Sequence, residues 1–383
     1  MPHPRTFDHV IVGAGLSGAL VALAVLARRP RDSIALVDRR ASLGTGQTWS
    51  FHERDVPAAL ADVIEPLVVR RWPAYDVRFP GLARTIPHAY ASVSSQRLDE
   101  VVSSALAAEP RAMRLTADVV SMSASEVVLA DGTRVGGRLV IDARGPSALA
   151  DVGACGYQKF VGVELETNGD VDVPRPVVFD ATVPQSDGFH FVYLLPFGPR
   201  RLLVEDTYYS DDPSLDATTL RARALDYAHA IGVRGHRVVR EERGVLPLPL
   251  DRMPDVSGAG PLAIGYAAGF FHPTTGYSFP LAARVALHVA TAGPAGARGA
   301  AFDALRSEHA RQARFALMLN RWLFRSIAPG ERFSVLERFH GLPDDVISRF
   351  YAMQTTHLDR ARIVCGRPPR GLSLRSALHE VSP

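Results

Sequence analysis

The chain has 383 residues, of which 47% are hydrophobic and 22% charged, a balance typical of a globular protein with room for two or three domains. Its net charge is only +3, and basic and acidic residues are interspersed, which argues against a nucleic-acid-binding surface. Two cysteines without Cys/His ligand spacing give no support for a disulfide framework or a zinc site, so we expect a reducing compartment and no bound metal.

The chain also lacks the patterns that direct proteins through or into membranes. The opening stretch MPHPRTFDHVIVGAG has no cleavable signal pattern. No apolar run reaches the ~20 residues that a membrane-spanning helix needs. These features predict a cytoplasmic protein.

The first motif is a strand, a glycine-rich turn, a helix and a second strand. Residues 8–12 form a short apolar strand, and Gly13-x-Gly15-x-x-Gly18 then opens a helix rich in Ala and Leu. The second strand ends at Asp38, whose carboxylate can accept hydrogen bonds from a ribose. Each glycine has a physical reason: a tight turn, close approach of a pyrophosphate, and close helix–strand packing, in that order. We therefore predict dinucleotide binding, and the alternative is a simple glycine-rich turn. The predicted contacts are Gly13, Ala14, Gly15, Leu16, Ser17, Gly18, Asp38 and Arg39.

Two later segments return to this nucleotide-binding domain, as in FAD proteins of the glutathione-reductase and hydroxybenzoate-hydroxylase type. Residues 116–145 read as a β-meander with a turn at Asp131-Gly132, and Val119 is the candidate to offer a backbone edge to an adenine. The alternative for Val119 is an ordinary strand residue. The second return is a predicted strand at 260–267 followed by the stretch GFFHPTTGYSFPLAARVA, residues 269–286.

That glycine- and aromatic-rich stretch leads into a helix predicted to start near Gly276. A helix N-terminus carries unpaired amides and positive dipole character, so the amides of Thr275, Gly276 and Tyr277 are expected to stabilise negative charge on a reduced flavin ring. Phe271 and His272 are assigned to the substrate site, and for His272 a structural capping role is the alternative.

The middle of the chain predicts a second sheet and its end predicts helices. Residues 155–210 alternate apolar and polar side chains in several runs, which predicts an antiparallel sheet, and residues 214–232 read as a helix. From about residue 296 the pattern is helical. Within it, residues 312–333 suit either a core helix or an interfacial helix that docks on a membrane.

We therefore predict an α/β fold with three parts. The parts are an FAD-binding Rossmann-like domain (1–75, 96–150 and 255–295), an inserted antiparallel-sheet substrate domain (76–95 and 151–254), and a C-terminal helical region (296–383).

Several stretches together carry a resemblance to one family. They are GTGQTWSFH (44–52), VIDARG, YLLPFGPRRLLVEDTYYSD (193–211), GFFHPTTGYSFPLA, LNRWLF (319–324) and RFYAMQTTHLDRARIVCGRPP (349–369). In this order they resemble the bacterial lycopene β-cyclases. The resemblance implies an enzyme that binds FAD, needs it reduced with NAD(P)H as reductant, and cyclises the ends of lycopene or other carotenoids without net redox change. It also implies peripheral contact with the inner face of the cell membrane, because lycopene resides there.

The resemblance points to an acidic pair as the catalyst. The family's FLEET motif is LVEDT here, with Glu205 kept and the second acid shortened to Asp206. Adjacent residues of a strand point to opposite faces, so at most one of the two faces a cavity directly unless the strand ends or bulges there. We predict Glu205 as the proton donor and Asp206 as its tuning partner. A solvated turn or an Arg-paired anchor is the alternative for this pair.

Trp49 and Phe51 are the remaining candidates, as an aromatic wall that stabilises a carbocation without offering a nucleophile. For Trp49 a core position is the alternative. Two rival functions also remain. A flavin-dependent prenyl reductase or an aromatic or lipid monooxygenase shares the glycine motifs, whereas a carotenoid-binding protein has no use for them.

Overall fold

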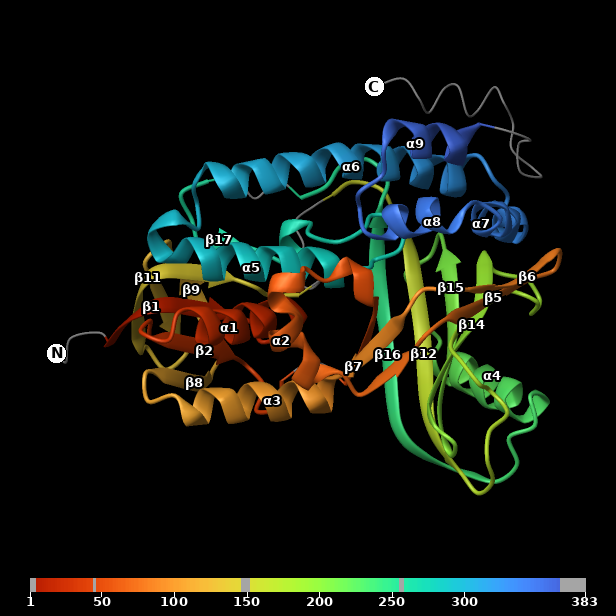
Figure 1. Cartoon of the computed structure of the whole chain (residues 1–383), viewed down its shortest axis with the longest axis horizontal. Coiled ribbons are helices and arrows are strands. Elements are labelled where there is room, and N and C mark those ends of the chain that lie inside the picture. Colours follow the sequence, from red (N-terminus) through yellow and green to blue (C-terminus); the bar gives the residue numbers. More distant parts are fainter. Residues whose placement is uncertain (1–4, 44–45, 146–151, 255–257, 366–383) are drawn as a thin grey trace.

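The computed structural model describes residues 5–43, 46–145, 152–254 and 258–365, and places two large sheets side by side with helices across the top (Figure 1). Residues 44–45 and 366–369 of the motifs quoted above lie outside these ranges. The first sheet has the strand order β8 (Ala112–Thr116), β2 (Ile34–Asp38), β1 (Arg5–Val12), β11 (Arg134–Asp142), β10 (Glu126–Leu129) and β9 (Val119–Met122), with β17 (Leu262–Ala263) beside β11.

The first sheet is the predicted nucleotide-binding framework. Strands β8, β2, β1 and β11 run parallel, and β9, β10 and β11 form the predicted antiparallel meander. The core packed on one face of this sheet contains residues of α1 (Leu16–Arg28), α3 (Ser95–Ala108) and α5 (Phe279–Gly296). The apolar run of β1 is buried on both faces because Ile11 belongs to that core, whereas Val10 and Val12 belong to a second one on the meander side.

The second sheet is the predicted antiparallel one. Its order is β16 (His236–Pro249), β12 (Cys155–Thr167), β15 (Arg201–Ser210), β14 (Phe189–Gly198), β13 (Val177–Asp180), β5 (Tyr75–Phe79) and β6 (Leu82–Ile86). Only β13 and β5 pair in parallel among these strands. The predicted helix appears as α4 (Ala217–Ala230) and packs on one face of the sheet, leaving the other face toward the rest of the molecule.

Smaller elements join the two sheets. A three-stranded sheet contains β3 (Thr48–His52), β7 (Tyr90–Ser94) and β4 (Arg70–Trp72), beside the short helix α2 (Ala61–Ile64). The C-terminal helices are α6 (Ala300–Arg325), α7 (Arg332–His340), α8 (Asp344–Tyr351) and α9 (His357–Val364). Helix α6 runs from beside α5 to the upper end of the second sheet, and α7 to α9 lie above that sheet (Figure 1). The domain boundaries given above remain a proposal.

The second return to the nucleotide-binding domain differs from its predicted form. Only Leu262–Ala263 of the predicted strand 260–267 is a strand, because Gly265 adopts a φ of 70° and the chain turns into a short 3-10 helix. Helix α5 starts at Phe279 rather than near Gly276. The reason is a tight turn in which the carbonyl of His272 accepts the amides of Thr275 and Gly276.

The segment 312–333 belongs mainly to the core. Leu317, Leu323 and Phe324 are buried. Arg332 is 1% exposed and donates to Asp211 and to the carbonyl of Leu323. An interfacial helix needs its apolar side chains free, so the core alternative describes this segment better.

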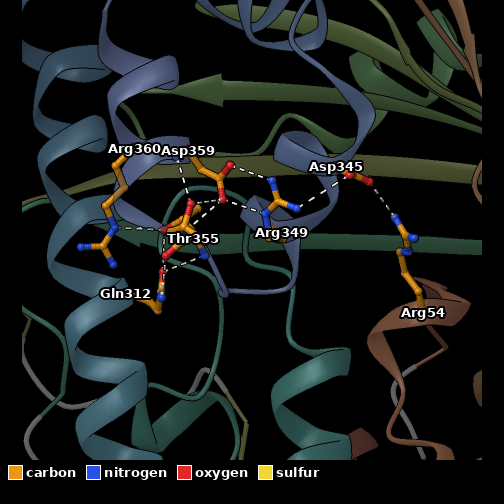
Figure 2. A network of polar contacts seen from close by, with 8 residues as sticks. Arg54, Gln312, Asp345, Arg349, Thr355, Asp359 and Arg360 are labelled. Carbon is orange, nitrogen blue, oxygen red and sulfur yellow. Dashed lines mark hydrogen bonds and ion pairs between the residues drawn. The ribbon is translucent and has the colours of Figure 1, made fainter.

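A polar network fastens α9 to α8 and α6 (Figure 2). Arg349 of α8 makes a bidentate pair with Asp359 of α9, with Nε–Oδ2 and Nη2–Oδ1 distances of 2.7 Å. Asp359 also completes a capping box with Thr356 at the start of α9. Gln312 of α6 accepts from the amide and hydroxyl of Thr355 just before this cap. The network fixes α8, and Tyr351 at its end reaches the cavity described below.

We predict that Arg349→Met loosens this region. The hydrogen bond from Arg349 lowers the pKa of Asp359, so the pair stabilises the fold fully above the ordinary carboxyl pKa and loses that effect as the pH falls. The melting temperature should drop by roughly 2–4 °C at pH 7, and the gap to wild type should shrink below pH 4. Circular dichroism melts of both proteins at pH 7 and below pH 4 measure this difference in melting temperature. Arg362→Met, on the exposed side of α9, is the matched control, and an equal loss in both variants contradicts the prediction.

Candidate functional site

A cavity of about 670 Å³ runs between the two large sheets. One end is formed by the glycine motif, the end of β2 and the start of the meander. The other is formed by the second sheet, β3, β7 and the loop before α5. Its lining includes Gly13, Gly15, Leu16, Ser17, Asp38, Arg39, Val119, Arg144, Trp49, His52, Tyr75, Tyr90, Gln158, Tyr193, Glu205, Glu242, Tyr266, Thr275, Gly276, Tyr277, Ser278 and Tyr351.

The glycine motif has the geometry of a dinucleotide cradle. Gly13 has a φ of 101°, and a Cβ there would lie 2.7 Å from the carbonyl oxygen of Ala143. A Cβ on Gly18 would lie 1.9 Å from the carbonyl oxygen of Gly13, so this glycine lets α1 pack close to the turn. Gly15 differs from both: a Cβ there meets nothing within 4 Å, although the residue lines the cavity. The open space at Gly15 fits a pyrophosphate.

The predicted nucleotide residues largely gather at this end of the cavity. Asp38 accepts the amide of Ala14 at 2.8 Å through Oδ2 and the amide of Arg40 at 2.9 Å through Oδ1, so its carboxylate also holds the turn. Arg39 and Val119 lie on the wall of the cavity, and Val119 is the first residue of the edge strand β9. Ala14 and Gly18 are not among the lining residues. Sequence reasoning missed Arg144, which lines the same end.

The opposite part of the cradle is the N-terminus of α5. Ser278, at the N-cap, makes no side-chain capping hydrogen bond, and Ser278 and Phe279 line the cavity. Thr275, Gly276 and Tyr277 also line it, but the amides of the first two donate to His272 within the turn. The positive end of the helix therefore starts later than predicted. Gln158 lies close by with its buried Oε1 lacking a hydrogen-bond partner, so an N–H donor of a bound ring fits there.

Aromatic side chains enclose the part of the cavity near the second sheet. His52 packs against Tyr75, Tyr90, Tyr277 and Tyr351, with ring centroids 5.0 to 6.1 Å apart. Burial lowers the pKa of His52 to about 3, so the ring is neutral at physiological pH. Such a wall offers π-faces and no charged base.

A buried acid orients one of these rings. Tyr277 accepts the amide of His52 at 3.1 Å and donates to Asp55 Oδ2 at 3.0 Å. Burial raises the pKa of Asp55 to about 7, although the hydrogen bond from Tyr277 and the charge of Arg284 oppose this rise. The hydroxyl of Tyr277 is thereby fixed and the face of its ring stays available to the cavity.

Three of the four predicted substrate contacts lie elsewhere. Trp49 lines the cavity as predicted. Phe51 points from β3 into the core and stacks on Phe279 at 4.0 Å. Phe271 is fully buried and stacks on Tyr266 at 3.8 Å. His272 is paired with the carbonyl of Phe350 at 3.1 Å and the amide of Thr274, and burial lowers its pKa to about 3. For His272 the capping alternative is the better description.

The alternation of β15 separates the predicted acidic pair. Glu205 faces the cavity, and Thr207 donates to its Oε1 at 2.9 Å. Asp206 is 1% exposed on the α4 side, where its Oδ1 lies 2.5 Å from Nε2 of His190. Asp206 is thus cut off from the cavity by the sheet itself, and the structure gives no support for its predicted catalytic role.

Glu205 sits in surroundings that favour its protonated form. Burial is the main cause, followed by the neighbouring carboxylate of Glu242, and together they raise the pKa of Glu205 well above its ordinary value despite the nearby Arg240. Sequence reasoning missed Glu242. The available signal is the two-residue spacing of Glu242, Gly244 and Leu246 in the stretch REERGVLPLPL (240–250), but only the pairing of β16 with β12 shows which face is the cavity face.

The described ranges contain neither a candidate metal site nor a candidate membrane-spanning helix. His, Cys, Asp and Glu side chains there form no group of three or more suited to a metal ion. None of the helices there combines the length and apolar character needed to traverse a bilayer.

Comparison with solved structures finds the same fold in other proteins, a flavin-dependent enzyme among them. A geranylgeranyl bacteriochlorophyll reductase-like protein from Thermoplasma acidophilum aligns with a TM-score of 0.60 over 99% of this chain and 96% of its own, at 13% identity. A flavin-dependent brominase aligns with a TM-score of 0.66 over 91% and 94%, at 16% identity. At such identities the likeness shows the fold alone, and it agrees with the predicted fold class.

Comparison of sequences is more specific. The chain is 44% identical over 377 residues to the lycopene beta-cyclase of a Paracoccus species, covering 95% of both chains. It is 40% identical over 372 residues to that of Pantoea ananas, covering 96% of both. The family model described as lycopene cyclase protein matches residues 8–377. The chain therefore belongs to the lycopene cyclase family.

Proposed function

We propose that this protein is a lycopene β-cyclase that converts linear ends of lycopene into β-rings by proton transfer without net redox change. The observation that carries the proposal is Glu205: a buried carboxyl with a raised pKa in a cavity walled by aromatic rings. An alkene is a very weak base, so its protonation needs an acid kept neutral in a dry site. The sequence identity of 44% and 40% to two bacterial lycopene beta-cyclases, over nearly the full length of each, supports a carotenoid substrate.

In the proposed reaction, Glu205 transfers the proton and the aromatic side chains that line the cavity stabilise the cation. Glu205 delivers a proton to carbon 2 of the terminal isoprene, which places the positive charge on the tertiary carbon 1. The neighbouring double bond closes the ring through carbon 6, and Glu205 recovers the proton that carbon 6 then loses. The rings of Trp49, Tyr90 and Tyr193 line the same cavity and stabilise the cation without trapping it.

FAD is the cofactor that the cradle fits best. The open space at Gly15 suits its pyrophosphate, Asp38 its ribose, and the N-terminus of α5 with Gln158 its flavin ring. Reduced FAD, when bound, supplies negative charge beside the cationic intermediate. NAD(P)H is the proposed reductant.

Gly15→Val should abolish FAD binding while the protein stays folded, because its side chain occupies the pyrophosphate space and its Cβ meets no protein atom within 4 Å. Bound flavin is measured by its absorbance after purification, together with a circular dichroism melt that reports folding. Gly13→Val is the comparison variant: its Cβ would clash with the Ala143 carbonyl, so it should also lower the melting temperature. Full flavin loading in a folded Gly15→Val protein contradicts the proposed cradle.

A flavin-dependent prenyl reductase or monooxygenase is the competing function, because such enzymes share the fold. Cyclisation leaves the oxidation state of the substrate unchanged, so reductant is needed only to prepare the enzyme. Under anaerobic conditions, protein reduced once should form many ring products for each reducing equivalent supplied. Chromatography of products against the amount of reductant measures this ratio, and a ratio of one favours the competing function.

Glu205→Gln tests the proposed acid directly. Glutamine keeps the size and polarity but has no carboxylic proton, so turnover should fall at least ~100-fold, the typical contribution of general acid catalysis. Bound flavin and the melting temperature should change little. Asp206→Asn is the matched neighbour on the other face of the sheet, and it should keep most of the turnover. Near-normal turnover in a folded Glu205→Gln protein rules out this assignment.

We further propose peripheral contact with the inner face of the cell membrane, because lycopene is a hydrocarbon that dissolves in bilayers and not in water. The outer face of α9 is the candidate surface: Leu358 is 59% exposed and Val364 37% exposed, beside the exposed Arg362. Replacing Leu358 and Val364 together by Glu should weaken flotation with anionic liposomes. Val120→Glu, at a 70% exposed site in the meander, is the control. Unchanged flotation of the double variant excludes α9 as the contact.

A further inference from the structure

Two carboxyl groups meet across a single glycine in the second sheet. Gly162 of β12 is paired with Glu205 on β15 and with Glu242 on β16, so the two acids flank it on the same face. A Cβ on Gly162 would lie 2.9 Å from Cγ of Glu242 and 3.4 Å from Oε2 of Glu205. Only a residue without a side chain leaves room for both carboxyls there.

The two acids have unlike partners. Oε2 of Glu242 accepts from Arg240 Nη1 at 2.7 Å and from the hydroxyl of Thr48 at 3.0 Å. Arg240 also donates to that hydroxyl at 2.6 Å and to Glu164 Oε2 at 2.8 Å. Glu205, by contrast, accepts the hydroxyl of Thr207 at Oε1. Glu242 is thus arranged as a carboxylate, and Glu205 as the member that carries a proton.

We propose that Glu242 is a positioning residue for the cyclisation: its carboxylate, held by Arg240 and Thr48 across Gly162, keeps Glu205 protonated in the resting enzyme. This inference rests on the proposed function of the site. The pair holds one proton at rest and none while the substrate is cationic, when two negative charges face the cation. The proton released from carbon 6 returns to Glu205, so protons and electrons balance over one turnover.

Two tyrosines next to Glu205 do not titrate near neutral pH. Tyr193 of β14 lies opposite Glu205, and its hydroxyl is 2.9 Å from that of Tyr90 of β7. Burial raises the pKa of Tyr90 to about 12 and that of Tyr193 well above its ordinary value. The charged side chain in contact with the pair is the guanidinium of Arg240, which donates to Glu242.

Infrared titration of the purified flavin-loaded protein tests the pair without relying on turnover. The carboxylic C=O band that disappears in Glu205→Gln reports Glu205, whereas the band of Asp55 stays in both proteins. Glu242→Gln removes the neighbouring negative charge, so the Glu205 band should titrate roughly one to three pH units lower than in wild type. The alkaline limb of the cyclisation rate should move down with it, because activity needs the protonated acid.

Two further variants fix the interpretation. Arg240→Gln removes the positive charge and should move the band to higher pH, which tests the pair even if Glu242→Gln fails to fold. Glu241→Gln, on the exposed side of β16, should leave the band in place. An unmoved band in Glu242→Gln or Arg240→Gln overturns the proposal. A moved band together with an active Glu205→Gln protein leaves the pair standing and rejects the proposed catalytic acid instead.

Discussion

In the proposed reaction the architecture serves one electrostatic constraint: a carboxyl group must stay neutral close to neutral pH and still reach a reacting carbon. Burial alone raises the pKa of a carboxyl, but a dry pocket needs walls from several elements. The second sheet supplies Glu205, the small sheet supplies Tyr90, and α8 supplies Tyr351. The Arg349–Asp359 network above the sheet therefore contributes to the site indirectly, by fixing the helix that carries Tyr351 (Figure 2).

The two large sheets divide the work of the cavity. The parallel sheet ends in a glycine turn and a helix N-terminus, which suit a phosphate and a ring with negative charge. The antiparallel sheet presents alternate side chains over long strands, which suits an extended apolar substrate. Adjacent side chains of β15 point to opposite faces of the sheet. Glu205 therefore faces the cavity, whereas Asp206 contacts His190 on the side covered by α4.

Local sequence patterns predicted much of this arrangement. The strand, glycine turn and helix at the N-terminus, the meander, the antiparallel sheet and α4 follow from periodicity and turn residues within short windows. The opposite faces of Glu205 and Asp206 follow from the two-residue period of a strand. The start of α5 was harder to predict, because the carbonyl of His272 closes a turn that delays the helix.

Contacts between distant segments could not be predicted in this way. Phe51 and Phe271 have the composition of a cavity wall, but their partners Phe279 and Tyr266 place them in the core. Glu242 lies 37 residues beyond Glu205 in the chain, and only the pairing of β16 and β15 with β12 brings the two acids together. Gly162 belongs to no sequence motif. Its importance for the two acids appears only once β15 and β16 are paired with β12 on either side of it.

The contact of Thr48 with the Arg240–Glu242 pair has a consequence for ligand binding. Thr48 precedes Trp49 on a strand that lines the same cavity as the glycine motif. An anion bound in this cavity adds negative potential at the two carboxyls and so raises their affinity for protons. Thermodynamic linkage makes the effect mutual: uptake of protons by the carboxyls strengthens binding of the anion. The affinity of the site for anionic ligands therefore declines as the solution becomes alkaline enough to remove the proton of Glu205.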